Sequence, residues 1–232
     1  MQAVYVCGGK GHRLQPRPVR AKSLMPVAGA SLFSRLVDRF GPLHRSPKPP
    51  VVIVDAEDEE MPREVEALLP GARLVVQREA DGVANALLFA QPLLDDAVIV
   101  TLGDLFFDGA FAPIDARPAV MLWPGAPAGE IRQNFGVVVS GGIVSRVVEK
   151  PVECRGLQCG LGVYVLTQPV ISCFRDAPID ARSGERGITD GLQAAIAAGV
   201  AFRGILFSGY YKNVNSQADV AAVERYLARP VG

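Results

Sequence analysis

A glycine-rich segment near the start of the chain has the residue types that bind phosphate. A strand-like run at 3–6 leads directly into Gly8, Gly9 and Gly11. Glycines let a backbone approach a phosphate closely and present its N–H groups. The spacing fits neither the dinucleotide fingerprint GxGxxG nor the Walker loop GxxxxGK followed by Ser or Thr. Because two prolines follow at 16 and 18, the spacing predicts an extended loop rather than an immediate helix.

The same segment carries five cations in thirteen residues and no acid. These cations are Lys10, Arg13, Arg17, Arg20 and Lys22. A charge run alone is more often a solvated loop. However, ligands of open α/β sheets bind beyond the carboxyl ends of strands, where this segment lies. The segment is therefore interpreted as a loop that binds a polyanion.

Acidic residues at strand ends are the candidates for metal binding. Asp104 ends the apolar run 97–104, and a carboxylate there suits Mg²⁺, which takes one or two protein carboxylates together with phosphates and water. The alternative is that Asp104 only caps the next turn. Asp55 has a similar position with no motif around it, so the turn interpretation is preferred there.

The elements that must position these residues alternate along the first half of the chain. Short β-branched runs end at 6, 55, 77, 104 and 123, and helix-period segments lie at 31–40, 59–69 and 83–94. Strands so uniformly apolar indicate burial on both faces. The alternation predicts βαβ units with right-handed crossovers, and hence a mainly parallel sheet. We expect a Rossmann-like three-layer α/β domain.

Beyond the fifth strand the pattern changes to a hairpin. Residues 136–151 form two alternating runs around a Gly-Gly turn. A further strand starts at Gly160, and two helices follow, one from Thr189 and one capped by Ser216. Because no linker, repeat or low-complexity tract interrupts the chain, the sequence predicts a single domain over residues 1–232 with an inserted β-hairpin in a mixed sheet.

Composition excludes several classes of protein. Hydrophobic residues make up 49% of the chain and charged residues 21%, which excludes a disordered protein. The 24 basic residues balance the 24 acidic ones, and no aromatic residue interleaves with the basic segment, so a nucleic-acid partner is not expected. The sequence has no apolar run of membrane-spanning length and does not start like a signal peptide. We expect a cytoplasmic protein without a membrane partner, whose four cysteines are reduced thiols.

The first thirty residues resemble the signature loop of the sugar-1-phosphate nucleotidylyltransferases, the nucleoside-diphosphate-sugar pyrophosphorylases. That signature reads GGxGxRLxP, then a Lys, then LxPVxG. The matching positions are Gly8, Gly9, Gly11, Arg13, Leu14, Pro16, Lys22, Leu24, Pro26, Val27 and Gly29. Further matches follow in family order: Gln77 with Gly82, GDLFFDG from Gly103, FGVV from Phe135, EKP from Glu149, GVY from Gly162, ITD from Ile188, and YYKNVN before the last helix. The resemblance covers nearly the whole chain.

The resemblance implies a role for each matching residue. Gly8, Gly9, Gly11 and Arg13 would hold the triphosphate, and Lys22 would neutralise charge around the reacting phosphates. Gln77 and Gly82 would contact the base, Glu149 the sugar hydroxyls and Lys150 the sugar phosphate. Arg13, Lys22 and Asp104 are therefore the expected catalytic residues, with Asp104 as a ligand of Mg²⁺.

Two departures from the family pattern bear on the metal site and on the sugar. Where relatives read WxDxGT and supply a second metal carboxylate, this chain has Asn213 and Asn215. Asn213 aligns with that Asp, whereas Asn215 aligns with the metal-binding Asn of the bifunctional N-acetylglucosamine-1-phosphate uridylyltransferases, so either would be the second metal ligand, with Asn215 favoured. Gly187 replaces the sugar-binding Glu of the family's EITD, which leaves the identity of the sugar open.

The expected activity is Mg²⁺-dependent transfer of a nucleoside monophosphate from a nucleoside triphosphate to a sugar 1-phosphate, which releases pyrophosphate. One alternative is transfer to a non-sugar phosphate, such as a phosphocholine, a phosphonate or a cyclitol phosphate. A second alternative is a non-catalytic regulatory subunit that binds nucleotide sugars. The sequence leaves the oligomeric state open, with a homodimer as the common default for soluble enzymes.

Overall fold

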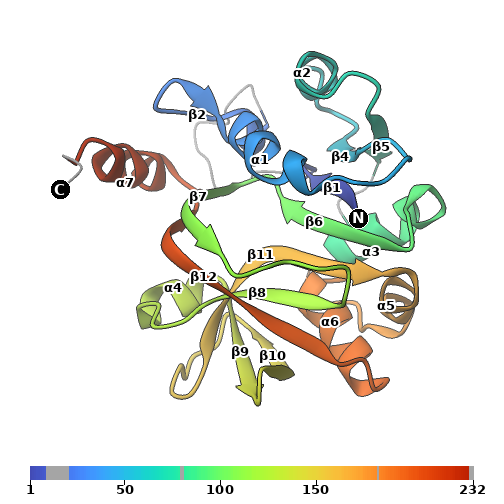
Figure 1. Ribbon diagram of the computed structural model, residues 1–232, viewed down its shortest axis with the longest axis vertical. Helices are drawn as coiled ribbons and strands as arrows, with labels where there is room; N and C mark the ends of the chain where they lie inside the picture. Colours follow the sequence, from blue (N-terminus) through green and yellow to red (C-terminus); the bar gives the residue numbers. More distant parts are fainter. Residues whose placement is uncertain (9–20, 79–80, 182, 230–232) are drawn as a thin grey trace.

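The structure is a computed structural model that describes residues 1–8, 21–78, 81–181 and 183–229 (Figure 1). Four parallel strands form one half of its main sheet. In order across the sheet they are β5 (Arg73–Gln77), β4 (Val51–Asp55), β1 (Gln2–Val6) and β6 (Ala97–Leu102). The alternation of strands and helices in the sequence predicted this parallel pairing, because a parallel pair needs a crossover connection.

Helices cover both faces of this half. Alternate residues of β1 face opposite layers, since side chains alternate across a strand. Ala3 and Tyr5 pack in an apolar cluster with α1 and α2, whereas Val4 and Val6 pack in a second cluster with α3, α5 and α6. The helices are α1 (Leu32–Phe40), α2 (Met61–Leu68), α3 (Val83–Ala90), α5 (Gln168–Cys173) and α6 (Ile188–Ala197). The predicted three-layer α/β arrangement is confirmed, with α1 and α2 above the sheet in Figure 1 and α5 and α6 below it.

The other half of the sheet is mostly antiparallel. β11 (Gln158–Thr167) runs antiparallel to β6 and to β8 (Ala119–Trp123), and β12 (Phe202–Asn213) runs parallel to β8. The predicted hairpin is β9 (Phe135–Ser140) with β10 (Ile143–Glu149). The sheet is mixed, as predicted, but it is not mainly parallel. β9 and β10 follow each other through a tight turn with no crossover helix, so they pair antiparallel.

A strand that the sequence did not predict brings distant segments together. β7 (Leu105–Phe111) pairs antiparallel with the second half of β12, from Phe207 opposite Phe111 to Asn213 opposite Leu105. The backbone N–H of Val214 donates to the carbonyl of Asp104 over 2.8 Å. This pairing places the Asp104 strand end beside the asparagines that follow β12.

The remaining elements are short connections and one C-terminal helix. They are η1 (Lys22–Leu24), β2 (Pro26–Val27), β3 (Ala30–Ser31), η2 (Gly41–Leu43), η3 (Gln91–Leu93), α4 (Ala128–Gln133), η4 (Phe174–Asp176) and α7 (Gln217–Leu227). Ser216 caps α7 as predicted, because its hydroxyl accepts from the N–H of Asp219. None of the helices in the described ranges is long and apolar enough to span a membrane.

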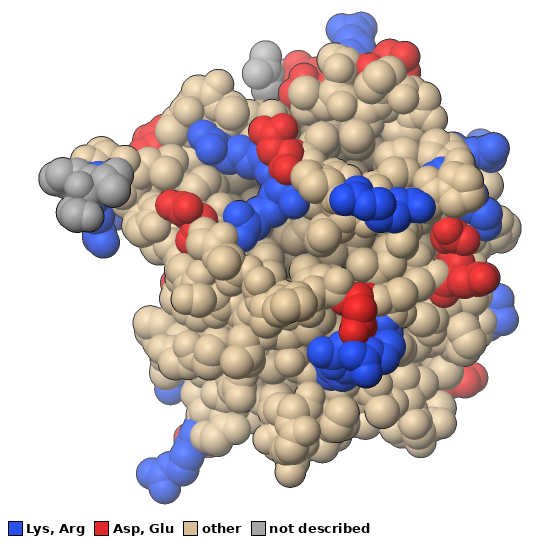
Figure 2. Space-filling model, viewed as in Figure 1, with Lys and Arg blue, Asp and Glu red and all other residues tan. Residues whose placement is uncertain are grey.

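Charged side chains are dispersed over the surface. On the face in Figure 2, basic and acidic residues are interspersed over a mainly uncharged surface. That dispersal agrees with the balance of 24 basic and 24 acidic residues. All four cysteines are free, as predicted.

Candidate active site

The carboxyl ends of β1, β4 and β6 meet at one edge of the sheet. The backbone N–H groups of Cys7 and Gly8 both donate to the carbonyl of Ile53, over 2.8 and 3.0 Å, and the N–H of Gly103 donates to the carbonyl of Val6 over 2.8 Å. A side chain at Gly103 would begin only 3.0 Å from Cys7 Sγ. The glycine therefore lets the chain that carries Asp104 pack against the end of β1.

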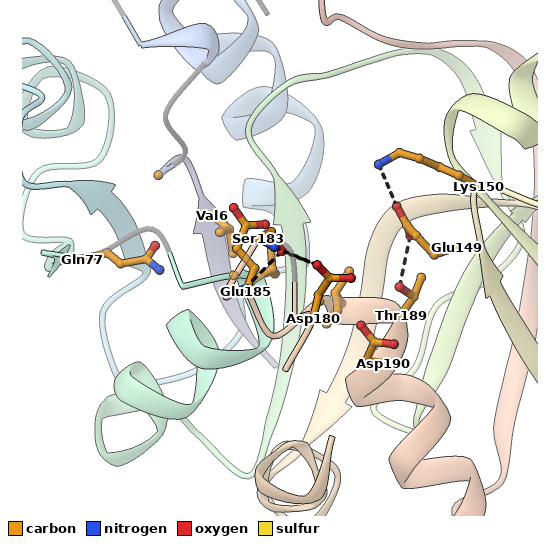
Figure 3. Close-up of a pocket in the computed structure, with 14 residues that line it drawn as sticks. Val6, Gln77, Glu149, Lys150, Asp180, Ser183, Glu185, Thr189 and Asp190 are labelled. Carbon is orange, nitrogen blue, oxygen red and sulfur yellow. Dashed lines mark hydrogen bonds and ion pairs between the residues drawn. The ribbon is translucent and has the colours of Figure 1, made fainter. Parts of the chain in front are cut away.

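A cleft of about 550 Å³ lies beyond these strand ends. Five of the residues predicted from the sequence line it, and they come from both halves of the sheet: Gly8, Gln77, Gly82, Glu149 and Lys150. Gln77 lies on one side of the cleft, and Glu149 and Lys150 lie on the other (Figure 3). This separation gives the cleft two ends with different chemistry.

The Gln77 end of the cleft is held by Asp81. Gln77 Nε2 donates to Asp81 Oδ1 over 2.6 Å, and the backbone N–H of Arg186 donates to the carbonyl of Asp81 over 2.7 Å. Gly82 has a φ of 98°, and a Cβ there would lie 2.2 Å from the carbonyl oxygen of Arg186. Only glycine fits this approach. Asp81 and Arg186 were not predicted from the sequence, because their contact joins segments about a hundred residues apart.

The opposite end of the cleft carries an exposed ion pair. Lys150 Nζ lies 3.1 Å from Glu149 Oε1, and Thr189 Oγ1 donates to Glu149 Oε2 over 3.1 Å. Both charged side chains are 50% exposed, so the pair adds little to stability. Lys150 has a φ of 39°, which is unusual for a residue other than glycine. Such a conformation persists only where neighbouring contacts hold it.

Asp190, the last residue of the ITD match, is an acid at this end to which the sequence analysis assigned no role. Burial, followed by the charges of Glu149 and Asp180, raises the pKa of the Asp190 carboxyl above its ordinary value. A Cβ at Gly187 would lie 2.8 Å from Asp190 Oδ2. The Asp190 carboxylate therefore lies beside the place where relatives carry a Glu side chain. The sequence hinted at this arrangement only through Gly187, which stands where the family pattern has Glu.

A second group of predicted residues lies at the end of β6 and β12. Lys22 Nζ donates to Asn215 Oδ1 over 2.7 Å and lies 3.7 Å from Asp104 Oδ2. The Lys22 and Asp104 side chains are 21% and 24% exposed. Burial raises the pKa of the Asp104 carboxyl above its ordinary value, and the neighbouring Lys22 opposes that rise. Asn215 Nδ2 in turn donates to Asn213 Oδ1 over 2.9 Å.

This second group has the donors of a hard-cation site with one carboxylate. Within the described ranges, no cluster of three or more His, Cys, Asp and Glu residues could hold a metal ion. Asp104 and Asn215 nevertheless direct oxygens toward one positive centre, the Lys22 ammonium. One carboxylate and one amide oxygen fit Mg²⁺, which usually completes its coordination with phosphates and water.

Three predicted residues of the glycine-rich segment, Gly9, Gly11 and Arg13, lie outside the described residues. Gly8 and Lys22 flank that segment, and both are described. Cys7, next to Gly8, is a packing residue, since burial raises the pKa of its thiol to about 12.

Comparisons with known proteins agree with this geometry. A family model described as "Nucleotidyl transferase" matches residues 2–214. The chain is 25% identical over 232 residues to the "Bifunctional protein GlmU" of Methanocaldococcus jannaschii, covering 98% of this chain and 54% of that protein. It is 26% identical to the "UTP--glucose-1-phosphate uridylyltransferase AglF" of Haloferax volcanii, covering 98% of this chain and 96% of that protein. This chain thus spans about half the length of the bifunctional relative.

Solved structures share the fold. A UDP-glucose pyrophosphorylase complexed with UDP-glucose superposes with a TM-score of 0.80 at 14% identity, covering 98% of this chain and 99% of that chain. The inositol-1-phosphate CTP transferase of T. maritima superposes with a TM-score of 0.77 at 15% identity, covering 100% of this chain and 97% of that chain. The predicted fold class is confirmed.

Proposed function

Because the chain belongs to the nucleotidyl transferase family, we propose that it transfers a nucleoside monophosphate from a nucleoside triphosphate to a sugar 1-phosphate. The products are a nucleotide sugar and pyrophosphate. The observation that carries the proposal is the two-ended cleft beyond the strand ends, which Gly82 helps to line, with Gln77 at one end and Glu149 and Lys150 at the other. The curated relative from Haloferax volcanii, whose length the chain nearly spans, is named for a sugar 1-phosphate acceptor.

The reaction needs positioning and positive charge more than covalent chemistry. An oxygen of the sugar phosphate attacks the α-phosphorus of the triphosphate in line with the departing pyrophosphate, and one P–O bond forms as another breaks. Negative charge grows on the phosphate oxygens as the bond changes occur. Lys150 would hold the acceptor phosphate as a point charge, and Glu149 would accept hydrogen bonds from sugar hydroxyls. Lys22 and Arg13 would neutralise the triphosphate.

We propose Asp104 and Asn215 as the protein ligands of Mg²⁺. A bound Mg²⁺ would stabilise negative charge on the phosphates. Asn215 is favoured over Asn213 because Asn215 Oδ1 faces Lys22 beside Asp104, whereas Asn213 Oδ1 already accepts from Asn215 Nδ2. The Asn215→Ala variant should weaken the Mg²⁺ dependence of turnover more than Asn213→Ala. A larger effect of Asn213→Ala would assign the ligand to Asn213.

A pyrophosphate-release screen across nucleoside triphosphates and sugar 1-phosphates tests the activity. We expect release that needs both a triphosphate and a hexose 1-phosphate. Release only with non-sugar phosphates would overturn the proposed acceptor, and no release with any pair would favour a regulatory binding protein. Cell fractionation would test the predicted cytoplasmic location, and light scattering would determine the oligomeric state, for which a homodimer is the default.

A further inference from the structure

Asn134, at the end of α4, uses all of its polar groups. It is only 8% exposed. Its backbone N–H and its Nδ2 both donate to the carbonyl of Glu130, over 3.1 and 2.9 Å. Its Oδ1 accepts from Tyr211 OH over 3.0 Å and from Asn213 Nδ2 over 3.2 Å. Its carbonyl accepts from the backbone N–H of Lys150 over 3.0 Å.

One set of these bonds leads to the Asp104 side of the site. Asn213 Nδ2 donates to Asn134 Oδ1, which turns the amide oxygen of Asn213 toward Asn215. That oxygen accepts a hydrogen bond from Asn215 Nδ2 over 2.9 Å. Asn215 Oδ1 is then left to face Lys22, 2.7 Å away. An amide has a donor end and an acceptor end, so the orientation of Asn134 sets which end of Asn215 faces Lys22.

The orientation of Asn134 is itself determined by its neighbours. The carbonyl of Glu130 can only accept, and it accepts from Nδ2 of Asn134. On the other side, the Nδ2 of Asn213 donates to Asn134 Oδ1. A flipped Asn134 would place Oδ1 against the Glu130 carbonyl, so that two acceptors face each other, and Nδ2 against the Asn213 donor. One orientation is therefore strongly preferred.

The other bond leads to the sugar-phosphate side. Lys150 adopts a left-handed backbone conformation, with φ 39°, and its N–H bond to Asn134 holds the chain at that point. Its side chain then reaches Glu149 at the end of the cleft. The same buried residue therefore contacts segments from both substrate sides of the site.

We propose that Asn134 is a positioning residue whose side chain orients the Asn215 oxygen toward the metal, while its backbone carbonyl fixes the Lys150 backbone from which the ammonium reaches the acceptor phosphate. This role rests on the proposed function. It involves no contact between Asn134 and a substrate. Outer residues that orient metal ligands commonly change metal affinity about 10–100-fold when they are removed.

The Asn134→Ala variant tests the role, with Tyr211→Phe as its matched control. Each change removes a bond at Asn134 Oδ1, but Tyr211→Phe leaves Asn213 held. We expect Asn134→Ala to raise the half-saturating Mg²⁺ concentration by about tenfold or more. The KM for sugar 1-phosphate should change little, because alanine keeps the backbone carbonyl that accepts from Lys150. Tyr211→Phe should leave both near the wild-type values at a similar melting temperature. Equal shifts in the two variants would reduce Asn134 to a structural role and overturn the proposal.

A second substitution provides a rescue that a structural defect would not allow. A carboxylate has an oxygen at both ends, so Asn215→Asp needs no orienting partner. In the Asn134→Ala background it should bring the half-saturating Mg²⁺ concentration back toward the wild-type value. If the Mg²⁺ requirement stays raised, the orienting role is wrong. Should Asn134→Ala fail to fold, the Asn134→Leu/Tyr211→Phe double variant removes the unpaired hydroxyl and should show the same shift in Mg²⁺ requirement.

The test separates this inference from the proposed function. Wild-type protein that releases no pyrophosphate with any acceptor overturns the proposed function. In that case Mn²⁺ binding in the presence of nucleotide, followed by electron paramagnetic resonance, still compares wild type with Asn134→Ala. Weaker Mn²⁺ binding by the variant supports the positioning role, and equal binding overturns it.

Discussion

Lys22 and Asn215 lie 193 residues apart in the sequence, and their side chains are joined by a hydrogen bond of 2.7 Å from the ammonium to the carboxamide oxygen. The same ammonium lies 3.7 Å from Asp104 Oδ2. The proposed ligands of Mg²⁺ therefore share one positive charge. Under the proposed function, a metal ion would compete with the Lys22 ammonium for these two oxygens.

The first prediction concerns this competition. Lys22→Met should bind free Mn²⁺ about fivefold more tightly or better than wild type, because a positive charge next to the ligands is gone. Turnover should fall sharply in the same variant, since the reacting phosphates lose a cation. Paramagnetic resonance titration without nucleotide measures the affinity. Weaker Mn²⁺ binding by Lys22→Met would show that the lysine does not compete with the metal.

The second prediction separates the two phosphate sites. Lys150→Ala should raise the KM for sugar 1-phosphate about tenfold to a hundredfold, the range expected for a lost charged contact. Its turnover at saturation should change less than that of Lys22→Ala, because Lys150 binds the acceptor in ground state and transition state alike. Initial rates at varied acceptor concentration decide the matter. An unchanged KM for sugar 1-phosphate in Lys150→Ala would show that the acceptor phosphate does not bind at Lys150.

The third prediction concerns the turn at Gly82. Gly82→Ala should lower the free energy of unfolding by about 2 kcal/mol or more, because the new methyl would meet the Arg186 carbonyl and φ is positive. Gly71→Ala is the control, since Gly71 also has positive φ but has nothing within 4 Å of a new Cβ. It should cost only about 1 kcal/mol. Equal losses in urea melts would show that the close approach to Arg186 is not a constraint.

The fourth prediction uses the raised pKa of Asp190. A carboxyl whose folded pKa exceeds its unfolded pKa favours its neutral form in the folded state, so its charge destabilises the fold at neutral pH. Burial, Glu149 and Asp180 raise this pKa. Asp190→Asn should therefore unfold with a higher free energy than wild type at pH 7. The gain should shrink as the pH falls through the folded pKa of Asp190 and should be absent below the unfolded value. A gain that does not depend on pH would contradict this cause.

Much of the fold was predictable because its first half repeats one pattern. Apolar strands separated by amphipathic helices predicted β1, β4, β5 and β6 and the helices between them. The predicted helix boundaries were less accurate. The third helix, predicted over 83–94, ends at Ala90, and a 3-10 turn that contains a proline follows directly after it. β7 was not predicted, because its residues were interpreted as part of a family motif rather than as a strand. Its pairing partner, β12, lies about a hundred residues later in the sequence, so no local pattern indicates the pairing.

The candidate site was predictable for residues whose type and position match the family pattern. Gln77, Gly82, Glu149 and Lys150 line one cleft, as their family positions suggested. Asn134 could not be found in the same way. Its role depends on bonds to Tyr211, Asn213 and Lys150, and spacing along a chain carries no sign of such contacts.

The most direct test of the central claim is the product of a single reaction. Wild-type protein, Mg²⁺, a nucleoside triphosphate and glucose 1-phosphate should yield a nucleotide sugar and pyrophosphate in equal amounts, measured by ion-exchange chromatography and phosphate release. Chelation of Mg²⁺ should stop the reaction, added Mg²⁺ should restore it, and Asp104→Ala should abolish it. Full turnover by Asp104→Ala, or pyrophosphate formed without any nucleotide sugar across the panel of triphosphates and sugar phosphates, would contradict the account.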